Sequence, residues 1–282
     1  MNILRHLLCS ALLLSALSPA LADASKPSTA AANVSLSAPL PMPGLNRERA
    51  LRIYLPPSYE KSPAKRYPVL YMHDGQNLFD AATSFAGEWG VDETLNELAR
   101  TEGLELIVVG IDNGGEHRTA EMSLFAAGPA QKPEGEAYLR FIAEVVKPMV
   151  DKRFRTLPDR DHTGMMGSSM GGLITHAALL RYPQLFGRAG VFSPSYWANM
   201  RMYDEAGLQA LPAGTRFYLY CGGNEGSMDA DALRMSRYLG QRNPDMAMEL
   251  RIAPMAGHNE AAWRAEFPRA VKWLVGAPTM AR

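Results

Sequence analysis

The chain has 282 residues, of which 47% are hydrophobic and 21% are charged. This is the composition of an ordinary globular protein, long enough for one large α/β domain or two small ones. Basic and acidic residues number 29 each, so the overall charge gives no reason to expect nucleic acid or an anionic membrane as a partner.

The first 22 residues have the pattern of a cleavable signal peptide. Arg5 supplies a short positive region, residues 7–17 are apolar, and Ala20-Leu21-Ala22 forms an A-x-A cleavage site. The alternative is an uncleaved anchor, which the shortness of the apolar run disfavours. We therefore expect a periplasmic or secreted protein, cleaved after Ala22 and without a membrane span once cleaved.

Residues 23–33 are rich in Ala, Ser and Pro and predict a flexible leader. Residues 34–282 then alternate strands with helices as one catalytic domain, without an internal repeat. The predicted strands are 34–37, 50–55, 68–72, 106–111, 162–166, 189–192, 216–221 and 248–252. The predicted helices are 92–100, 134–154, 170–181, 229–240 and 260–274.

This alternation implies a mainly parallel sheet flanked by helices, because parallel strands need helical crossovers. Turns alone separate the strands before residue 55, which predicts an antiparallel edge. Eight strands in this order fit the α/β-hydrolase fold.

Gly167-Ser168-Ser169-Met170-Gly171 has the G-x-S-x-G pattern of a nucleophile elbow. A predicted strand precedes it and a predicted helix follows, which is the setting in which this pattern exposes a reactive serine. The tight turn strains the serine backbone and brings the strand and helix ends together, so the positions two before and two after must be small. Gly167 and Gly171 occupy those positions, and we predict that Ser169 is a nucleophile.

A serine nucleophile needs a histidine base, held in one tautomer by an acid. His258 is the histidine that follows the serine on a loop after the last predicted strand, and we predict that it is the base. The acid is expected after the strand that ends at Cys221. Glu225 is the first acid there and is favoured, whereas Asp229 has the position of a helix N-cap and remains the alternative.

An oxyanion hole needs two backbone N–H groups. One is expected from Met170, which follows the nucleophile, and the other from Gln76, on the loop after an early predicted strand. The alternative for this loop is a simple Asp-Gly turn at a strand end. It also carries two candidate substrate contacts, Asp74 and Asn77.

Three further side chains are candidate substrate contacts: Trp89, Asp112 and Trp197. Core packing is the alternative for the two tryptophans, and a solvated loop position is the alternative for Asp112. We expect neither a metal nor a dinucleotide cofactor, because the chain has no H-E-x-x-H, C-x-x-C or G-x-G-x-x-G pattern.

Four blocks of sequence together resemble the putative esterase family over residues 45–275. They are Tyr71-Met72-His73-Asp74-Gly75-Gln76-Asn77-Leu78-Phe79-Asp80, Gly167-Ser168-Ser169-Met170-Gly171-Gly172, Phe192-Ser193-Pro194-Ser195-Tyr196-Trp197 and Gly257-His258-Asn259-Glu260. The family includes feruloyl and acetyl esterases, siderophore-trilactone esterases, formylglutathione hydrolases and mycolyltransferases.

The resemblance implies an α/β-hydrolase fold and a catalytic pair of Ser169 and His258. It also implies an acid at Glu225 and oxyanion contacts from the amides of Gln76 and Met170. The chain departs from the family in one place. Relatives often carry an Arg-x-x-Glu-Tyr-Ser-Pro-like stretch, where this chain has Arg118-Thr119-Ala120-Glu121-Met122-Ser123-Leu124.

The sequence thus predicts an exported serine hydrolase that cleaves a carbohydrate-linked or siderophore-type carboxylic ester. Its expected partner is a small-molecule or oligosaccharide ester. One alternative is an acyltransferase that passes the acyl group to a sugar hydroxyl through the same triad. Another is a non-catalytic ligand-binding protein on a hydrolase scaffold, which the presence of all three triad residues disfavours.

Overall fold

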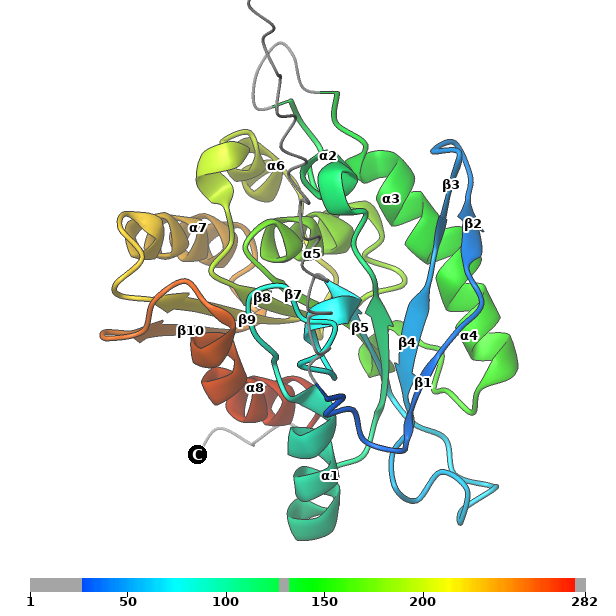
Figure 1. The fold of residues 1–282 in the computed structure, drawn as a ribbon. Helices are drawn as coiled ribbons and strands as arrows, with labels where there is room; N and C mark the ends of the chain where they lie inside the picture. Colours follow the sequence, from blue (N-terminus) through cyan, green and yellow to red (C-terminus); the bar gives the residue numbers. More distant parts are fainter. Residues whose placement is uncertain (1–26, 127–131, 277–282) are drawn as a thin grey trace, which may run out of the picture.

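An eight-stranded sheet forms the centre of the computed structural model, which describes residues 27–126 and 132–276 (Figure 1). Its spatial order is β1-β4-β6-β5-β7-β8-β9-β10. These strands are β1 (Val34–Leu36), β4 (Leu51–Tyr54), β5 (Val69–His73), β6 (Ile107–Ile111), β7 (Thr163–Ser168), β8 (Arg188–Phe192), β9 (Arg216–Gly222) and β10 (Ala247–Ala253). All eight predicted strands are therefore confirmed, with bounds shifted by one or two residues.

The sheet is parallel from β6 to β10 and antiparallel at one edge. β5 pairs in parallel with both β6 and β7, and the parallel pairing continues through β8 and β9 to β10. β4 pairs antiparallel with β6 and with β1. The predicted antiparallel edge is thus confirmed, and the carboxyl ends of the parallel strands share one side of the sheet.

Helices cover both faces of this sheet (Figure 1). The five predicted helices correspond to α1 (Val91–Glu102), α3 and α4 (Gly135–Phe141 and Lys147–Arg153), α5 (Met170–Arg181), α7 (Met228–Arg242) and α8 (Glu260–Val275). A π-helical segment, Ile142–Val146, separates α3 from α4, where one continuous helix was expected.

Four short elements were not predicted: the β2–β3 hairpin (Leu40–Met42 and Arg47–Arg49), α2 (Arg118–Glu121) and α6 (Met202–Leu208). Each has seven residues or fewer. So short a segment does not complete enough turns or alternations to show a periodic pattern, and tertiary contacts decide its conformation.

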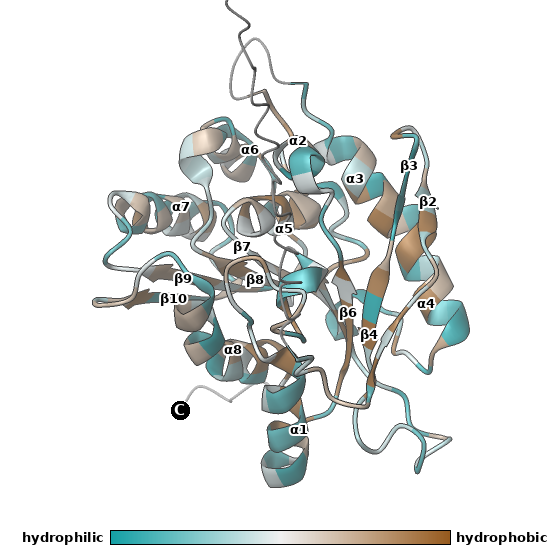
Figure 2. Ribbon diagram, in the orientation of Figure 1, coloured by the Kyte–Doolittle hydropathy of each residue, from teal (hydrophilic) through white to brown (hydrophobic). Residues whose placement is uncertain are grey.

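The strands bury side chains on both faces, as an α/β sandwich requires. Val69 and Tyr71 of β5 belong to the core under α3–α7. Leu70 and Met72 point the other way, into the core shared with α1 and α8. Central strands are largely brown in Figure 2, whereas the outer helices carry much of the teal.

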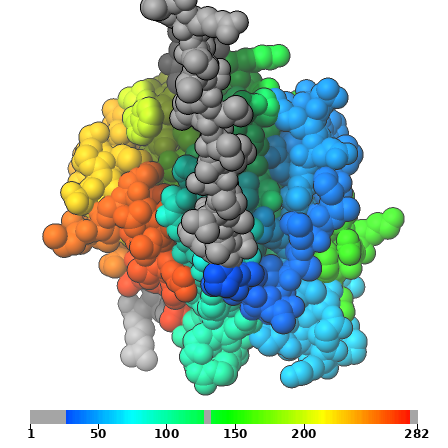
Figure 3. All heavy atoms as spheres, viewed as in Figure 1, coloured from blue at the N-terminus to red at the C-terminus, as the bar shows by residue number. Residues whose placement is uncertain are grey.

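The start of the described chain, which falls within the flexible leader predicted for residues 23–33, makes hydrogen bonds to the domain. The Ser28 hydroxyl donates to Asp80 at 2.8 Å, and the Ala31 amide donates to Asp92 at 2.7 Å. Figure 3 shows this segment, in dark blue, against the teal of α1. Carboxylates of the domain thus bind residues 28–31 through hydrogen bonds. The Ala- and Ser-rich composition of this segment gives no sign of these contacts.

The expected signal peptide, residues 1–22, lies outside the described residues. Among the helices that are described, none combines the length and the apolar character needed to cross a membrane.

Candidate active site

The G-x-S-x-G segment forms a sharp turn between β7 and α5. Ser169 has φ 58° and ψ −120°, a strained conformation for a residue with a side chain. Its amide donates to the Phe192 carbonyl of β8 at 2.9 Å, which anchors the turn to the sheet. A Cβ on Gly167 would lie 2.8 Å from the backbone of Gly171, so the turn requires glycine there. The predicted elbow geometry is confirmed.

Glu225 and His258 come from neighbouring loops that the backbone holds together. The Gly223 amide donates to Ala253 at 2.8 Å, and the Asn224 amide donates to Ala256 at 3.0 Å. A Cβ on Gly222 would lie 2.3 Å from the Ala256 carbonyl oxygen. The glycines before Glu225 therefore permit the close approach that brings its side chain to the loop after β10.

The carboxylate of Glu225 meets the imidazole of His258, with Oε2 2.9 Å from Nδ1. Its other oxygen, Oε1, accepts from the Ser193 hydroxyl and the Gly222 amide, both at 2.7 Å. Burial alone raises the pKa of this carboxyl, but the hydrogen bonds from His258, Ser193 and Gly222 hold it below its ordinary value. Glu225 is thus an ionised, fully buried acceptor for the histidine.

A short relay fixes the direction of these hydrogen bonds. The Trp263 indole nitrogen lies 3.0 Å from Ser193 Oγ. An indole N–H can only donate, so Ser193 Oγ accepts there and its own proton points at Glu225 Oε1. The Trp263 ring also packs edge-on against His258, with centroids 5.0 Å apart. Trp263 thereby supports both members of the acid–base pair, and we had not predicted it.

The alternative acid, Asp229, makes a different contact. Its Oδ1 accepts from the Ala230 amide at 2.7 Å, at the start of α7. Among the hydrogen bonds of the described residues, those to the His258 ring come from Glu225 alone. The geometry therefore pairs His258 with Glu225.

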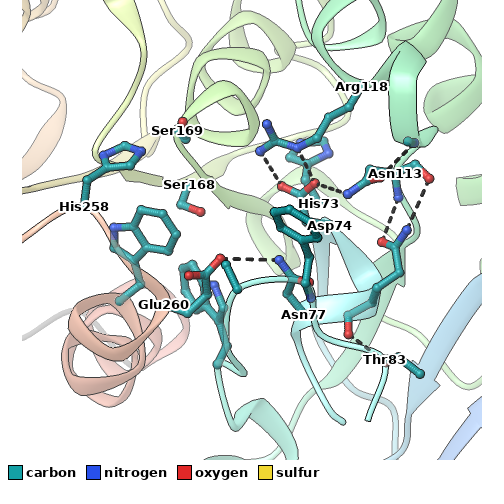
Figure 4. Close-up of a pocket in the computed structure, with 16 residues that line it drawn as sticks. His73, Asp74, Asn77, Thr83, Asn113, Arg118, Ser168, Ser169, His258 and Glu260 are labelled. Atoms are coloured by element: carbon teal, nitrogen blue, oxygen red, sulfur yellow. Dashed lines mark hydrogen bonds and ion pairs between the residues drawn. The ribbon is translucent and has the colours of Figure 1, made fainter. Parts of the chain in front are cut away.

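Ser169 and His258 line one cavity of about 580 Å³ at the carboxyl ends of the central strands. Figure 4 shows both on one side of this pocket, with Arg118 and Asn113 on the other. The Ser169 hydroxyl lies 3.2 Å from Ser195 Oγ. Within the described part of the chain, no hydrogen bond joins Ser169 to His258, although they share the pocket.

The two predicted oxyanion donors occupy suitable local positions. Met170 is the first residue of α5, and Gln76 lies in a short 3-10 turn that follows the left-handed Asp74 (φ 57°). Neither backbone N–H finds an acceptor among the described residues. Gln76 also lines the pocket, and its side-chain carbonyl accepts from the Asn113 amide at 2.9 Å, which ties its loop to the loop after β6.

Two candidate substrate contacts on this loop lie in the pocket, but each already has protein partners. Asp74 accepts from the Arg118 guanidinium at 2.6 and 2.8 Å and from Asn113 at 2.7 Å. Asn77 donates to Glu260 at 3.4 Å and accepts from the Phe85 amide at 3.1 Å. These hydrogen bonds hold the side chains of Asp74 and Asn77 in fixed positions in the wall of the pocket.

Trp89 lines the pocket and also packs on Trp263 and Phe192. It is therefore part of the core and remains a candidate substrate contact. Asp112 and Trp197, the other two candidate substrate contacts, do not line the pocket. Asp112 instead accepts from Arg52 at 2.8 Å, across the antiparallel edge of the sheet. Trp197 is 63% exposed. Asp112 immediately precedes Asn113, which does line the pocket, so position along the chain alone does not separate the two.

The pocket also holds charged and aromatic residues that we did not predict to bind substrate, among them Arg118, Glu260 and Phe85. Glu260 had a usable signal, because it follows the predicted base by two residues. His73 lines the pocket too, but burial lowers its pKa to about 4 and its Nδ1 lies 2.8 Å from the Tyr138 hydroxyl. His73 is therefore a neutral, structural histidine.

One group of carboxylates lies near the start of α1, away from the pocket lining. Ligand atoms of Glu88, Asp92 and Glu93 lie within 4.8 Å of one another. Burial raises the pKa of Asp92 to about 7. Glu88 and Asp92 accept hydrogen bonds from Thr29 and Ala31 and so bind the N-terminal segment of the described chain.

Comparison with known proteins agrees with this architecture. The family model described as "Putative esterase" matches residues 43–274. The uncharacterized protein YbbA of Bacillus subtilis is 28% identical over 249 residues, which are 81% of this chain and 93% of YbbA. The ferri-bacillibactin esterase BesA of the same organism is 25% identical over 55% of this chain and 57% of BesA.

An endo-1,4-beta-xylanase/feruloyl esterase of Xylanibacter ruminicola is 26% identical over 57% of this chain, which spans 22% of that protein. Among solved structures, the BES protein from Bacillus cereus superposes with a TM-score of 0.70 at 18% identity, over 89% of this chain and 98% of that one. The match to the family model covers most of the chain and includes both strand-end loops that carry Glu225 and His258. The chain therefore belongs to the Putative esterase family and is a carboxylic ester hydrolase with the predicted α/β-hydrolase fold.

Proposed function

We propose that this esterase is a serine hydrolase in which Ser169, His258 and Glu225 form the catalytic triad. The observation that carries the proposal is the 2.9 Å contact between Glu225 Oε2 and His258 Nδ1, at a pocket that also contains the strained Ser169. An ionised acceptor at Nδ1 holds the proton there, which leaves Nε2 free to accept the serine proton.

The reaction begins when the Ser169 hydroxyl turns from Ser195 towards His258 Nε2. Its oxygen attacks the ester carbonyl while the imidazole takes the proton, and Glu225 stabilises the imidazolium. The imidazolium then protonates the leaving alcohol, and an acyl-enzyme remains. Water activated by His258 releases the acid and restores the serine.

Backbone amides of Met170 and Gln76 are the proposed donors to the developing oxyanion. Both are free of protein acceptors among the described residues. The Met170 amide also lies in the first turn of α5, where the helix dipole favours negative charge. The Arg118–Asp74 pair holds the Gln76 loop in place, so these donors do not need to reorganise during the reaction.

The proposed substrate is a carbohydrate-linked or siderophore-type ester. Two relatives support this range by their names, one a feruloyl esterase attached to a xylanase and the other a ferri-bacillibactin esterase. The pocket supports it by size, because a cavity of about 580 Å³ accommodates a drug-sized acyl or alcohol group.

Export is part of the proposal and rests on the signal-peptide pattern of residues 1–22. Mass spectrometry of the protein recovered from the periplasm and the medium tests it. An N-terminus at Asp23 supports export, and an intact N-terminus confined to the cytoplasm contradicts it.

The triad is tested with para-nitrophenyl acetate and a fluorophosphonate label on the purified protein. We expect Ser169→Ala to lose at least about a thousandfold in kcat and all labelling, because nothing else in the triad can attack the carbonyl. Ser236→Ala, at a partly exposed serine of α7, is the matched control and should retain both turnover and labelling. Wild-type turnover by Ser169→Ala would refute the proposal.

Product analysis with added sugar distinguishes hydrolysis from acyl transfer.

A further inference from the structure

The charges of the ionised side chains that line the pocket do not sum to zero. Arg118 gives both arms of its guanidinium to Asp74, at 2.6 and 2.8 Å, so each neutralises the other. Glu260 lines the same pocket and forms no salt bridge with any residue of the described ranges. His73 is neutral, because burial lowers its pKa to about 4. One carboxylate is therefore left without an ion-pair partner among the described residues.

The position of Glu260 keeps its side chain facing the pocket. It is the first residue of α8, immediately after the Asn259 cap, whose side chain accepts from the Ala262 amide at 3.0 Å. Its Oε1 accepts from Asn77 at 3.4 Å, as the dashed line in Figure 4 shows. Its Oε2 has no hydrogen-bond partner among the described residues. One oxygen is thus held by the protein and the other is open to a ligand.

Two opposing influences act on this carboxyl. Burial raises its pKa above the ordinary value, and the negative charge of Asp74 adds to the effect. Its own backbone N–H, at the start of α8, favours the anion, as helix N-termini do, and the charges of His258 and Arg118 act in the same direction. The ionised carboxylate is an anion in a partly closed pocket, where a charge acts more strongly than it does in water.

We propose that Glu260 determines the charge selectivity of this esterase, favouring uncharged, hydroxyl-bearing esters over esters that carry an anionic group near the scissile bond. The inference rests on the proposed function and narrows its substrate class. A sugar or polyol hydroxyl can donate to the open Oε2, as it would to any buried carboxylate acceptor. A carboxylate or catecholate in the same place is repelled by Glu260. Arg118 does not offset this repulsion, because its guanidinium is bound to Asp74.

Two matched ester pairs test the proposal on both sides of the scissile bond. Para-nitrophenyl butyrate and para-nitrophenyl hemisuccinate differ in charge on the acyl side, and para-acetoxybenzamide and para-acetoxybenzoate differ on the alcohol side. The measured quantity is the ratio of kcat/KM for the neutral ester to that for the anionic one. Comparing this ratio between wild type and Glu260→Gln cancels the intrinsic reactivity of each ester.

For at least one pair, the ratio should fall roughly three- to tenfold in Glu260→Gln, the effect of one unit charge a few ångströms away in a half-open pocket. Glu102→Gln makes the same change in net charge on the exposed end of α1, where Glu102 meets Lys272, and should leave both ratios unchanged. In the wild type, the ratio should also fall as salt rises from about 0.01 M to about 1 M, because the screening length shrinks from about 30 Å to about 3 Å.

The salt series uses the unmodified protein, so it tests for charge selectivity even if Glu260→Gln fails to fold. Ratios that change neither with salt nor in Glu260→Gln overturn the proposal while leaving the esterase itself intact. Failure to hydrolyse any of the four esters overturns the proposed function, and the charge selectivity with it.

Discussion

Glu225→Gln is the most informative single change to the proposed triad, because the structure dictates how the new amide must orient. Oε1 of Glu225 accepts two hydrogen bonds, from the Ser193 hydroxyl and the Gly222 amide. In Glu225→Gln the carbonyl oxygen has to occupy that place, since an amide N–H₂ there would face two donors. The amide nitrogen then lies where Oε2 was, 2.9 Å from His258 Nδ1.

That orientation reverses the histidine. Nδ1 becomes the acceptor and the ring proton moves to Nε2, which can no longer take the proton of Ser169. We expect kcat to fall about 10³- to 10⁴-fold, or roughly 4–5 kcal/mol of transition-state stabilisation. Stability should change little, because the side-chain shape and both hydrogen bonds to Oε1 are kept.

The assay is kcat for para-nitrophenyl acetate, with thermal unfolding measured alongside. Asp229→Asn is the matched control: Asp229 was the alternative acid, and it contacts Ala230 at the start of α7. This control should keep kcat within about twofold. If Glu225→Gln retained more than a tenth of the wild-type kcat, or if Asp229→Asn lost as much, the orientation argument would be refuted.

Three further predictions concern stability. Gly167→Ala places a Cβ 2.8 Å from the backbone of α5 and should cost about 2–3 kcal/mol together with most activity. Gly240→Ala in α7, with ordinary contact at 3.7 Å, should be neutral or stabilising in the same melts; equal losses would contradict the steric argument. Burial lowers the pKa of His73 to about 4 and that of His176 to about 3, whereas an unfolded histidine titrates near 6.5. The contribution of these two histidines to the free energy of unfolding is therefore complete above about pH 6.5. It is lost as the pH falls towards 4, and the free energy of unfolding drops by roughly 2–5 kcal/mol for the pair. Urea unfolding at both pH values should show this loss, reduced in His176→Gln; parallel losses in the two proteins would count against it. Burial raises the pKa of Asp92 to about 7, so its carboxylate penalises folding as the pH rises from about 4 through 7. Asp92→Asn should therefore raise the melting temperature by about 4–8 °C at pH 8 and hardly at all at pH 4, and an equal shift at both would exclude the titration as its cause.

The sequence by itself determined the sheet and the elbow. The parallel strands are short apolar runs bounded by turns, and they are recognisable because burial on both faces demands apolar residues at every position. Ser169 was predictable for a local reason: a turn with positive φ needs small neighbours on both sides, and Gly167 and Gly171 supply them. His258 followed from chain order together with its place on a loop after the last predicted strand.

Tertiary structure decided which side chains share the pocket. Glu225 and Asp229 are equally acidic in sequence, and only the close approach of the Gly222–Gly223 backbone to the loop after β10 brings Glu225 to His258. The same holds for Arg118 and Trp263, whose partners Asp74 and Ser193 lie 44 and 70 residues away along the chain. Asp112 shows the converse, since it precedes the pocket residue Asn113 in sequence and yet lies outside the pocket. Periodicity records which face of a strand or helix is buried, whereas a site depends on the meeting of several loops, and no local pattern encodes that meeting.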